Sequence, residues 1–166
     1  MRTLLWMMVG LVTALVLDGL TARAGHGARW MDPYLILVVV FASRGGKARA
    51  MIGGGAAGFL QDLVASAVFG VHYLGKLVVG YAASLVASRL IPGQALTAAV
   101  LLGGATLLEK LVFSVAGLVL GTDFAVGTPI EIGVQVLVNI GVGMLAFRAV
   151  DRFARRRPGP GGARGR

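Results

Sequence analysis

Residues 53–81 constrain the fold of this chain more than any other part of the sequence. The stretch is apolar and long enough to cross a lipid bilayer twice, because a spanning helix needs about 20 residues. It nevertheless contains Asp62 and Lys76, whose charges are costly in lipid. Ionisable side chains in such a position face protein or a water-filled cavity. The stretch therefore predicts two helices with a polar surface turned away from lipid.

The composition of the whole chain indicates an integral membrane protein. Of its 166 residues, 57% are hydrophobic and 14% are charged, and the mean hydropathy is +0.82. Cysteine is absent and there are two histidines, His26 and His72, so we predict no disulfide, no metal and no cofactor. The net charge of +9 comes mostly from basic residues at the ends of apolar segments, which indicates membrane topology and not nucleic-acid binding.

Apolar segments between polar breaks predict an all-α fold, a polytopic membrane bundle of about six transmembrane helices. The segments are residues 3–20, 32–43, 47–68, 72–90, 94–120 and 128–150. The second is shorter than the roughly 17–25 residues of a spanning helix. We expect a short spanning helix there, with a partly buried or re-entrant helix as the alternative. The bundle is predicted to occupy residues 1–150, and residues 151–166 are predicted to be a basic, disordered cytoplasmic tail.

The distribution of basic residues predicts that both termini are cytoplasmic. In that topology twelve Lys and Arg residues lie on the inner side, whereas Arg23 and Arg29 lie outside. A cleaved signal peptide is the alternative interpretation of the first segment, because Ala22 and Ala24 have the small-x-small spacing of a cleavage site. Asp18 interrupts the apolar run of that segment and favours a retained helix.

Four predicted helices have small or polar residues at every fourth position, which places those residues on one face. Small residues at this spacing let helices approach closely, and polar ones hydrogen-bond across the contact. The predicted packing positions are Gly54, Gly58, Gly80 and Ser84. The candidate residues for binding a partner or ligand are Asp62, His72, Lys76, Glu109, Lys110, Glu131, Gln135 and Asn139.

The ionisable residues within the segments are predicted to gather in the outer half of the membrane. At 1.5 Å per residue, Asp62 lies about 22 Å along its helix from the cytoplasmic Lys47. Because an unpartnered buried charge costs several kcal/mol, we expect these residues to pair, with Asp62 and Lys76 as the first pair. The sequence thus predicts a polar cluster that opens toward the outside. Whether it is a structural ion-pair network or a binding site is left open.

The same residues resemble a known family. Gly58-Phe59-Leu60-Gln61-Asp62, Gly70-Val71-His72-Tyr73-Leu74 and Gly80-Tyr81 follow one another in the order and spacing typical of the rod shape-determining protein MreD. Asp32-Pro33-Tyr34-Leu35 is similar to the proline-containing start of the family's second helix, although here the acidic residue precedes the proline. Length, helix number and basic ends agree as well, so the resemblance covers nearly the whole chain.

The resemblance implies a non-enzymatic scaffold in the bacterial inner membrane, within the elongasome that supports lateral peptidoglycan synthesis and rod shape. The implied partners are MreC and, directly or indirectly, MreB, RodA and a transpeptidase, together with membrane lipids. A homodimer stays open. The resemblance also implies a bundle like that of the substrate-binding S components of energy-coupling-factor transporters.

That likeness supplies the alternative function, uptake of a small solute such as a vitamin. An S component would also have a polar pocket near the outer face. The first segment has Gly10 and Ala14 four residues apart but lacks the alanine pair that S components use for docking, and aromatic residues for stacking on a ligand are few, at 7%. An enzyme is disfavoured because the sequence has no H-E-x-x-H, no G-x-S-x-G and no cysteine nucleophile.

Overall fold

The computed structural model describes residues 2–23, 30–44, 46–65, 68–90, 95–122 and 126–155. These residues form helices and no strand, in the order α1 (Arg2–Arg23), α2 (Pro33–Ala42), α3 (Lys47–Ala65), α4 (Val71–Ala87), α5 (Ala95–Leu120) and α6 (Pro129–Arg155). Each helix overlaps one of the predicted apolar segments. The all-α prediction is confirmed, because local hydrophobic runs and their polar breaks define these helices without reference to the tertiary structure.

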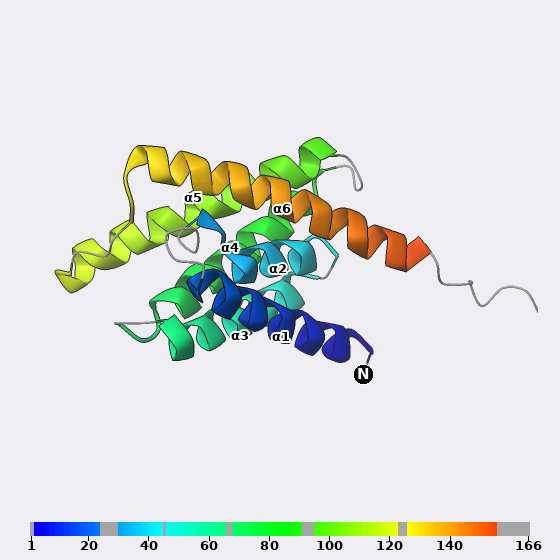
Figure 1. Cartoon of the computed structure of the whole chain (residues 1–166), viewed down its shortest axis with the longest axis horizontal. Coiled ribbons are helices and arrows are strands. Elements are labelled where there is room, and N and C mark those ends of the chain that lie inside the picture. The colour runs from blue at the N-terminus through cyan, green and yellow to red at the C-terminus, as the bar shows by residue number, and fades with distance from the viewer. Residues whose placement is uncertain are drawn as a thin grey trace, which may run out of the picture.

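Two helices, α5 and α6, are long and apolar enough to span a membrane, over Ala95–Leu120 and Pro129–Arg152. They lie side by side along the long axis of the molecule (Figure 1). The α6 helix continues to Arg155 instead of ending at the predicted boundary, residue 150. Residues 156–166 of the predicted tail lie outside the described residues.

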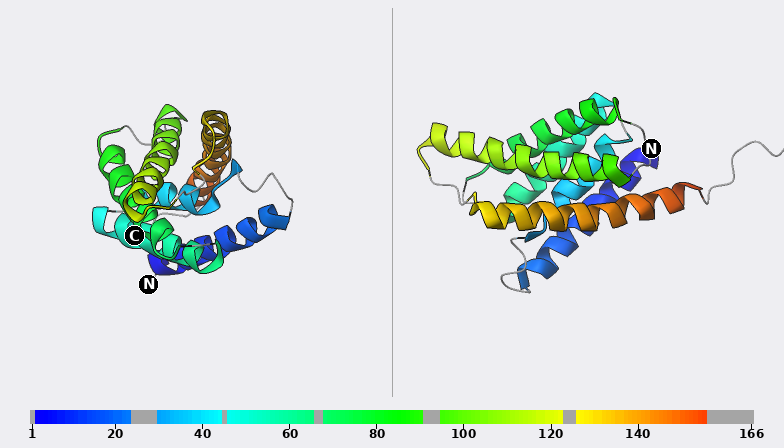
Figure 2. Two further views of the ribbon diagram at one scale, coloured as in Figure 1. Left: turned by 90° about the vertical axis from the view of Figure 1, so that its left-hand side faces the viewer. Right: turned by 90° about the horizontal axis from the view of Figure 1, so that it is seen from above.

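The short helix α2 lies at the centre of the bundle. It contacts each of the other five helices, and Figure 2 shows it between the α5–α6 pair and α1. Eight of its ten residues are buried, which fits a helix that is apolar on every side. At 1.5 Å per residue α2 covers about 15 Å, half the thickness of a hydrocarbon core. By itself α2 is therefore too short to cross the hydrocarbon core of a membrane. Its burial agrees with the alternative interpretation of this segment as a helix buried among the others.

The helices α3 and α4 form the most extensive contact of the bundle. A Cβ atom at Gly54 would overlap the carbonyl oxygen of Lys76, and one at Gly58 would overlap that of His72. Gly80 lies in the same way against the carbonyl oxygen of Ala50. These glycines let the two backbones approach more closely than any side chain would allow.

The buried Ser84 is also on α4. The small-residue faces of α3 and α4 are therefore turned toward each other. The predicted packing positions Gly54, Gly58 and Gly80 thus lie inside this contact, and Gly54 and Gly58 leave no open surface for a partner helix.

Replacing Gly58 by alanine should lower the stability of the protein. The added methyl group would meet the backbone of α4, which cannot move aside as a flexible side chain could, and overpacking costs typically about 1–3 kcal/mol. The midpoint of thermal unfolding of the purified protein measures the effect.

The matched control is Gly104→Ala on α5, where nothing lies within 4 Å of an added Cβ. Alanine favours a helix over glycine by about 1 kcal/mol, so this variant should be at least as stable as the parent. Equal midpoints for the two variants would contradict the close packing of α3 on α4.

Candidate functional site

Lys76 of α4 is the central residue of a buried ion-pair cluster. Its Nζ atom donates to Asp32 Oδ2 at 2.7 Å and to Glu109 Oε1 at 2.6 Å. The side chains of Lys76, Asp32 and Glu109 are 0%, 9% and 3% exposed, respectively. Hydrogen bonds between charged groups at these distances are the stronger class of protein hydrogen bonds. The lysine therefore ties α4 to the start of α2 and to the middle of α5.

Asp32 belongs to the cluster because it is also the N-cap of α2. Its Oδ1 atom accepts from the backbone N–H of Leu35 at 2.9 Å, which satisfies one of the donors that a helix start leaves unpaired. Pro33 follows at the first helical position, where proline is favoured. Asp32 was absent from the predicted site residues. An aspartate followed by proline at the start of an apolar run is the signal that could have identified it.

The cluster continues into α6 through a pair of neutral side chains. The backbone N–H of Asp32 donates to Asn139 Oδ1 at 3.1 Å, and Asn139 Nδ2 donates to Thr106 Oγ1 at 3.1 Å. The Thr106 hydroxyl donates in turn to the carbonyl oxygen of Leu102, within α5, at 2.8 Å. Both Asn139 and Thr106 are fully buried. The buried cluster, defined here as Asp32, Lys76, Thr106, Glu109 and Asn139, thus connects α2, α4, α5 and α6.

Asp62 has a different role from the one predicted. Its carboxylate accepts from the backbone N–H groups of Gly70, His72 and Tyr73 at 3.0, 3.1 and 2.9 Å. The Nδ1 atom of His72 lies 2.9 Å from Asp62 Oδ1. A negative charge at this position caps the start of α4, where free N–H groups and the helix dipole favour an anion. Gly70 at the N-cap has φ 99°, a conformation that glycine adopts without steric cost.

The predicted pair of Asp62 and Lys76 is therefore wrong, since Lys76 pairs with Asp32 and Glu109 instead. The physical reason is that Asp62 stands at the end of α3, next to backbone donors that have no partner in their own helix. Lys76 comes three to six residues after those donors, and its side chain is turned toward Asp32 and Glu109. His72, a candidate binding residue, contacts the same carboxylate through its backbone N–H and its Nδ1 atom.

The remaining candidate residues lie apart from the cluster. Glu131 is exposed and forms a capping box with Thr128. Its Oε2 atom accepts from the Thr128 N–H at 2.7 Å, and Thr128 Oγ1 accepts from the Glu131 N–H at 3.3 Å. Gln135 is buried on α6, one turn before Asn139, and Lys110 is half-buried beside Glu109. Glu131 was predicted in the intramembrane cluster, and the structure assigns it to the start of a helix.

The buried cluster is closed, although we predicted one that opens toward the outside. The cavities described in the structure have other linings, at the end of the bundle where α6 finishes and along α4 and α5. In the part of the chain that the structure describes, no group of three His, Asp or Glu side chains has the arrangement of a metal site. Two carboxylates that face one ammonium group from two other helices can hold those helices together.

Replacing Lys76 by methionine should strongly destabilise the protein. The change leaves two carboxylates buried without a counter-charge, and breaking a buried pair in this way costs about 3–5 kcal/mol. Glu109→Gln should cost only about 1 kcal/mol, because Asp32 still balances the lysine and the amide oxygen can still accept from Nζ. Thermal unfolding of the purified variants measures both.

The triple variant Asp32→Asn, Lys76→Met, Glu109→Gln should recover most of the loss, since it has no uncompensated charge. The exchange Asp62→Lys with Lys76→Asp should recover nothing. Recovery in the exchange variant, or a Lys76→Met protein as stable as the parent, would contradict the assignment of the pairs.

Comparison with known proteins gives one match. A family model described as rod shape-determining protein MreD matches residues 1–147. This range contains the whole buried cluster and the contact between α3 and α4. No curated protein and no solved structure matches the chain, so the implied likeness to S components stays a prediction.

Proposed function

The chain belongs to the MreD family of rod shape-determining proteins, and we propose that it acts as a non-enzymatic, multi-pass scaffold of the inner membrane. In this proposal it binds MreC and so supports lateral peptidoglycan synthesis by the elongasome. The match over residues 1–147 is the observation on which the proposal rests, because it includes all but the end of α6. It also confirms the resemblance inferred from the sequence motifs.

The closed interior supports a scaffold over a carrier or an enzyme. A carrier needs a cavity with polar groups for its ligand, and an enzyme needs such groups within reach of a substrate. Here the buried Lys76 and Glu109 are hydrogen-bonded to each other, and the buried Asn139 is hydrogen-bonded to Asp32 and Thr106. Uptake of a small solute therefore has no support from the structure. A protein whose polar groups fix its own helices presents a defined outer surface to partners.

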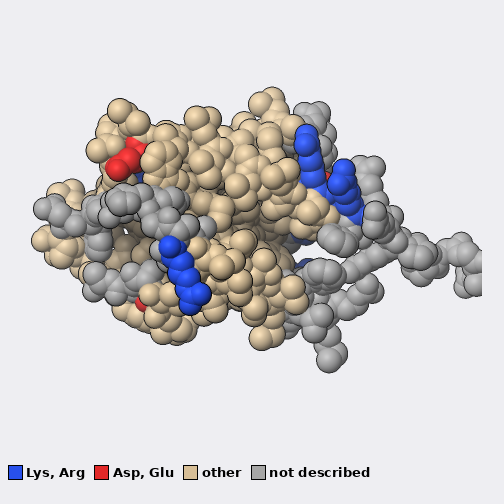
Figure 3. Space-filling view, viewed as in Figure 1, with Lys and Arg blue, Asp and Glu red and all other residues tan. Residues whose placement is uncertain are grey.

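The ends of the helices support the proposed orientation, with both termini in the cytoplasm. Figure 3 shows basic side chains at the end of the molecule where α6 finishes, and most of the face between the two ends is free of charge. Arg44 follows α2, Lys47 opens α3, Arg89 follows α4 and Arg148 lies near the end of α6. All four are exposed, and positive charge at helix ends is retained on the cytoplasmic side.

A cysteine introduced at Thr122 should react with a membrane-impermeant thiol reagent added to intact spheroplasts, and one at Gly46 should not. Both residues are exposed and lie beyond helix ends, on opposite sides of the bundle. The chain has no cysteine of its own, so each introduced thiol gives an unambiguous signal. Labelling of the Gly46→Cys protein from outside would overturn the proposed topology.

We assign the MreC contact to the outer face of α6. This helix is the less buried of the two membrane-length helices, and its residues Ile130, Leu137 and Leu145 are largely exposed. Gly133 and Gly141 lie on the same side, and nothing within 4 Å would meet a Cβ atom at either position. Glycine on an outer helix face lets a second transmembrane helix approach closely.

Replacing Gly141 by leucine should weaken co-purification with MreC, because the larger side chain keeps a second helix from approaching closely. The protein itself should fold normally, since the added side chain has room. Quantifying MreC retained on the tagged variant after membrane solubilisation measures the loss.

Gly19→Leu on α1 is the matched control, because this glycine is also exposed with nothing within 4 Å of an added Cβ. Cells that depend on the Gly141→Leu variant should become round, whereas cells with Gly19→Leu should stay rod-shaped. Normal MreC retention by a stably inserted Gly141→Leu protein would exclude the α6 face as the contact.

A further inference from the structure

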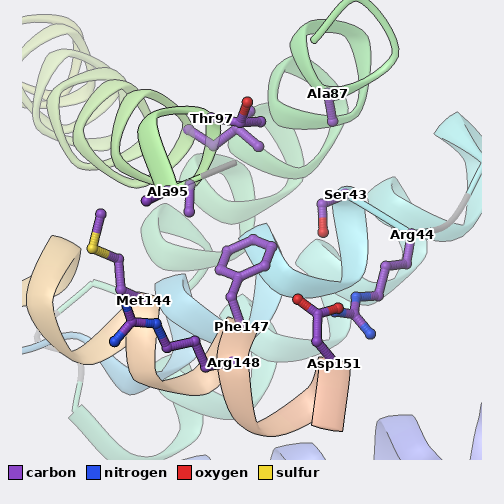
Figure 4. Close-up of a pocket in the computed structure, with 11 residues that line it drawn as sticks. Ser43, Arg44, Ala87, Ala95, Thr97, Met144, Phe147, Arg148 and Asp151 are labelled. Carbon is purple, nitrogen blue, oxygen red and sulfur yellow. The ribbon is translucent and has the colours of Figure 1, made fainter. Parts of the chain in front are cut away.

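A cavity of about 330 Å³ lies at the end of the bundle where α2, α4 and α6 finish and α5 begins. Its polar lining includes Arg44, Arg148 and Asp151, and its apolar lining includes Leu101 and Phe147. Figure 4 shows Arg44 and Asp151 turned toward each other on one side of Phe147, with Arg148 on the other side. The cavity lies among the basic helix ends that the charge pattern places at the cytoplasmic surface.

The charges of this cavity favour an anion. Arg44 donates to Asp151 at 2.6 Å, so these two charges neutralise each other. Arg148 is exposed and forms no ion pair with any residue in the described ranges. Two arginines and one aspartate give the cavity a net charge of +1.

An apolar groove lies next to this cavity, between α4 and α5. The groove has a volume of about 200 Å³, and Leu101 lines both it and the cavity. From Leu101 it extends along α5 past Gly104 to Leu108, with Val86 of α4 on its other side. All nine of its lining residues are apolar, and Val86 and Val100 are exposed at its surface.

We propose that the cavity and the groove together bind one anionic phospholipid of the cytoplasmic leaflet. The phosphate of the headgroup lies against Arg148, and one acyl chain lies in the groove along Gly104. Basic pockets between membrane helices on the cytoplasmic side are suited to anionic headgroups. The occupant must be polar at one end and apolar over a groove of about two helical turns, and it must neutralise one positive charge. A lipid such as phosphatidylglycerol meets all three requirements.

The headgroup half of the site is tested by native mass spectrometry of the purified protein, supplied in turn with phosphatidylglycerol, phosphatidylethanolamine and phosphatidylcholine. The parent protein should retain phosphatidylglycerol in preference to the other two. Arg148→Gln should lower retention of phosphatidylglycerol about fivefold, the effect expected for one arginine near a lipid headgroup. Arg152→Gln is the matched control, because Arg152 is exposed on the same helix but does not line the cavity, and it should change retention less than twofold.

The acyl-chain half of the site is tested by Gly104→Leu, which places a larger side chain in the groove at a position where nothing lies within 4 Å of an added Cβ atom. This variant should lose the bound lipid, while Gly19→Leu on α1, which lines neither the cavity nor the groove, should keep it, and neither variant should unfold at a lower temperature than the parent. Equal retention of the three lipids, or unchanged retention by Arg148→Gln, would overturn the headgroup assignment. Unchanged retention by Gly104→Leu would overturn the groove. A protein dimer that Gly104→Leu dissociates would assign the groove to a second copy of the chain and overturn the proposal.

Discussion

The hydrogen-bonded ion pairs of Lys76 with Asp32 and Glu109 hold the middle of the bundle together, because they join α4 to the start of α2 and to α5. Removing such charges from water is expensive, and their mutual attraction offsets the cost only when the geometry is good and the remaining polar atoms are satisfied. Here Asp32 meets that condition through its cap on Leu35 and its N–H bond to Asn139. The central position of α2 depends on this arrangement, because α2 begins at Asp32.

The close packing of α3 on α4 places the lysine where it can form these pairs. Gly54 lies against the carbonyl group of Lys76 itself, so the approach of α3 sets the position of the lysine backbone. On the other side, Gly75 faces Glu109, and a Cβ atom there would lie 3.7 Å from Glu109 Cγ. Asp62 fixes the turn before α4 through three backbone N–H groups. The ion pairs and the glycine contacts are thus parts of one arrangement, and a change in either affects the other.

An interior fixed in this way leaves partner binding to the outer surfaces. These differ in their chemistry: α6 presents an apolar face with glycines, whereas the end where α6 finishes presents arginines around a cavity. An apolar face with small residues suits a transmembrane helix, and a basic cavity joined to an apolar groove suits a lipid. The apolar face with glycines extends along α6, whereas the cavity lies where this helix finishes.

The sequence by itself determined the membrane class, the helices and the family, since hydrophobicity, turn residues and local motifs act over a few residues of chain. The sequence also contains the signals for the helix caps formed by Asp32 and Glu131, because each carboxylate accepts from a backbone N–H only three residues away. Only the tertiary structure decided which carboxylates face Lys76, because Asp32 and Glu109 are 44 and 33 residues away from it. The rotation of each helix selects such partners, and that rotation follows from the packing of all the helices together. The same holds for the glycines. Nothing in the local sequence distinguishes Gly54 and Gly58 from Gly141 as packing positions. The tertiary packing buries the first two and leaves the third exposed.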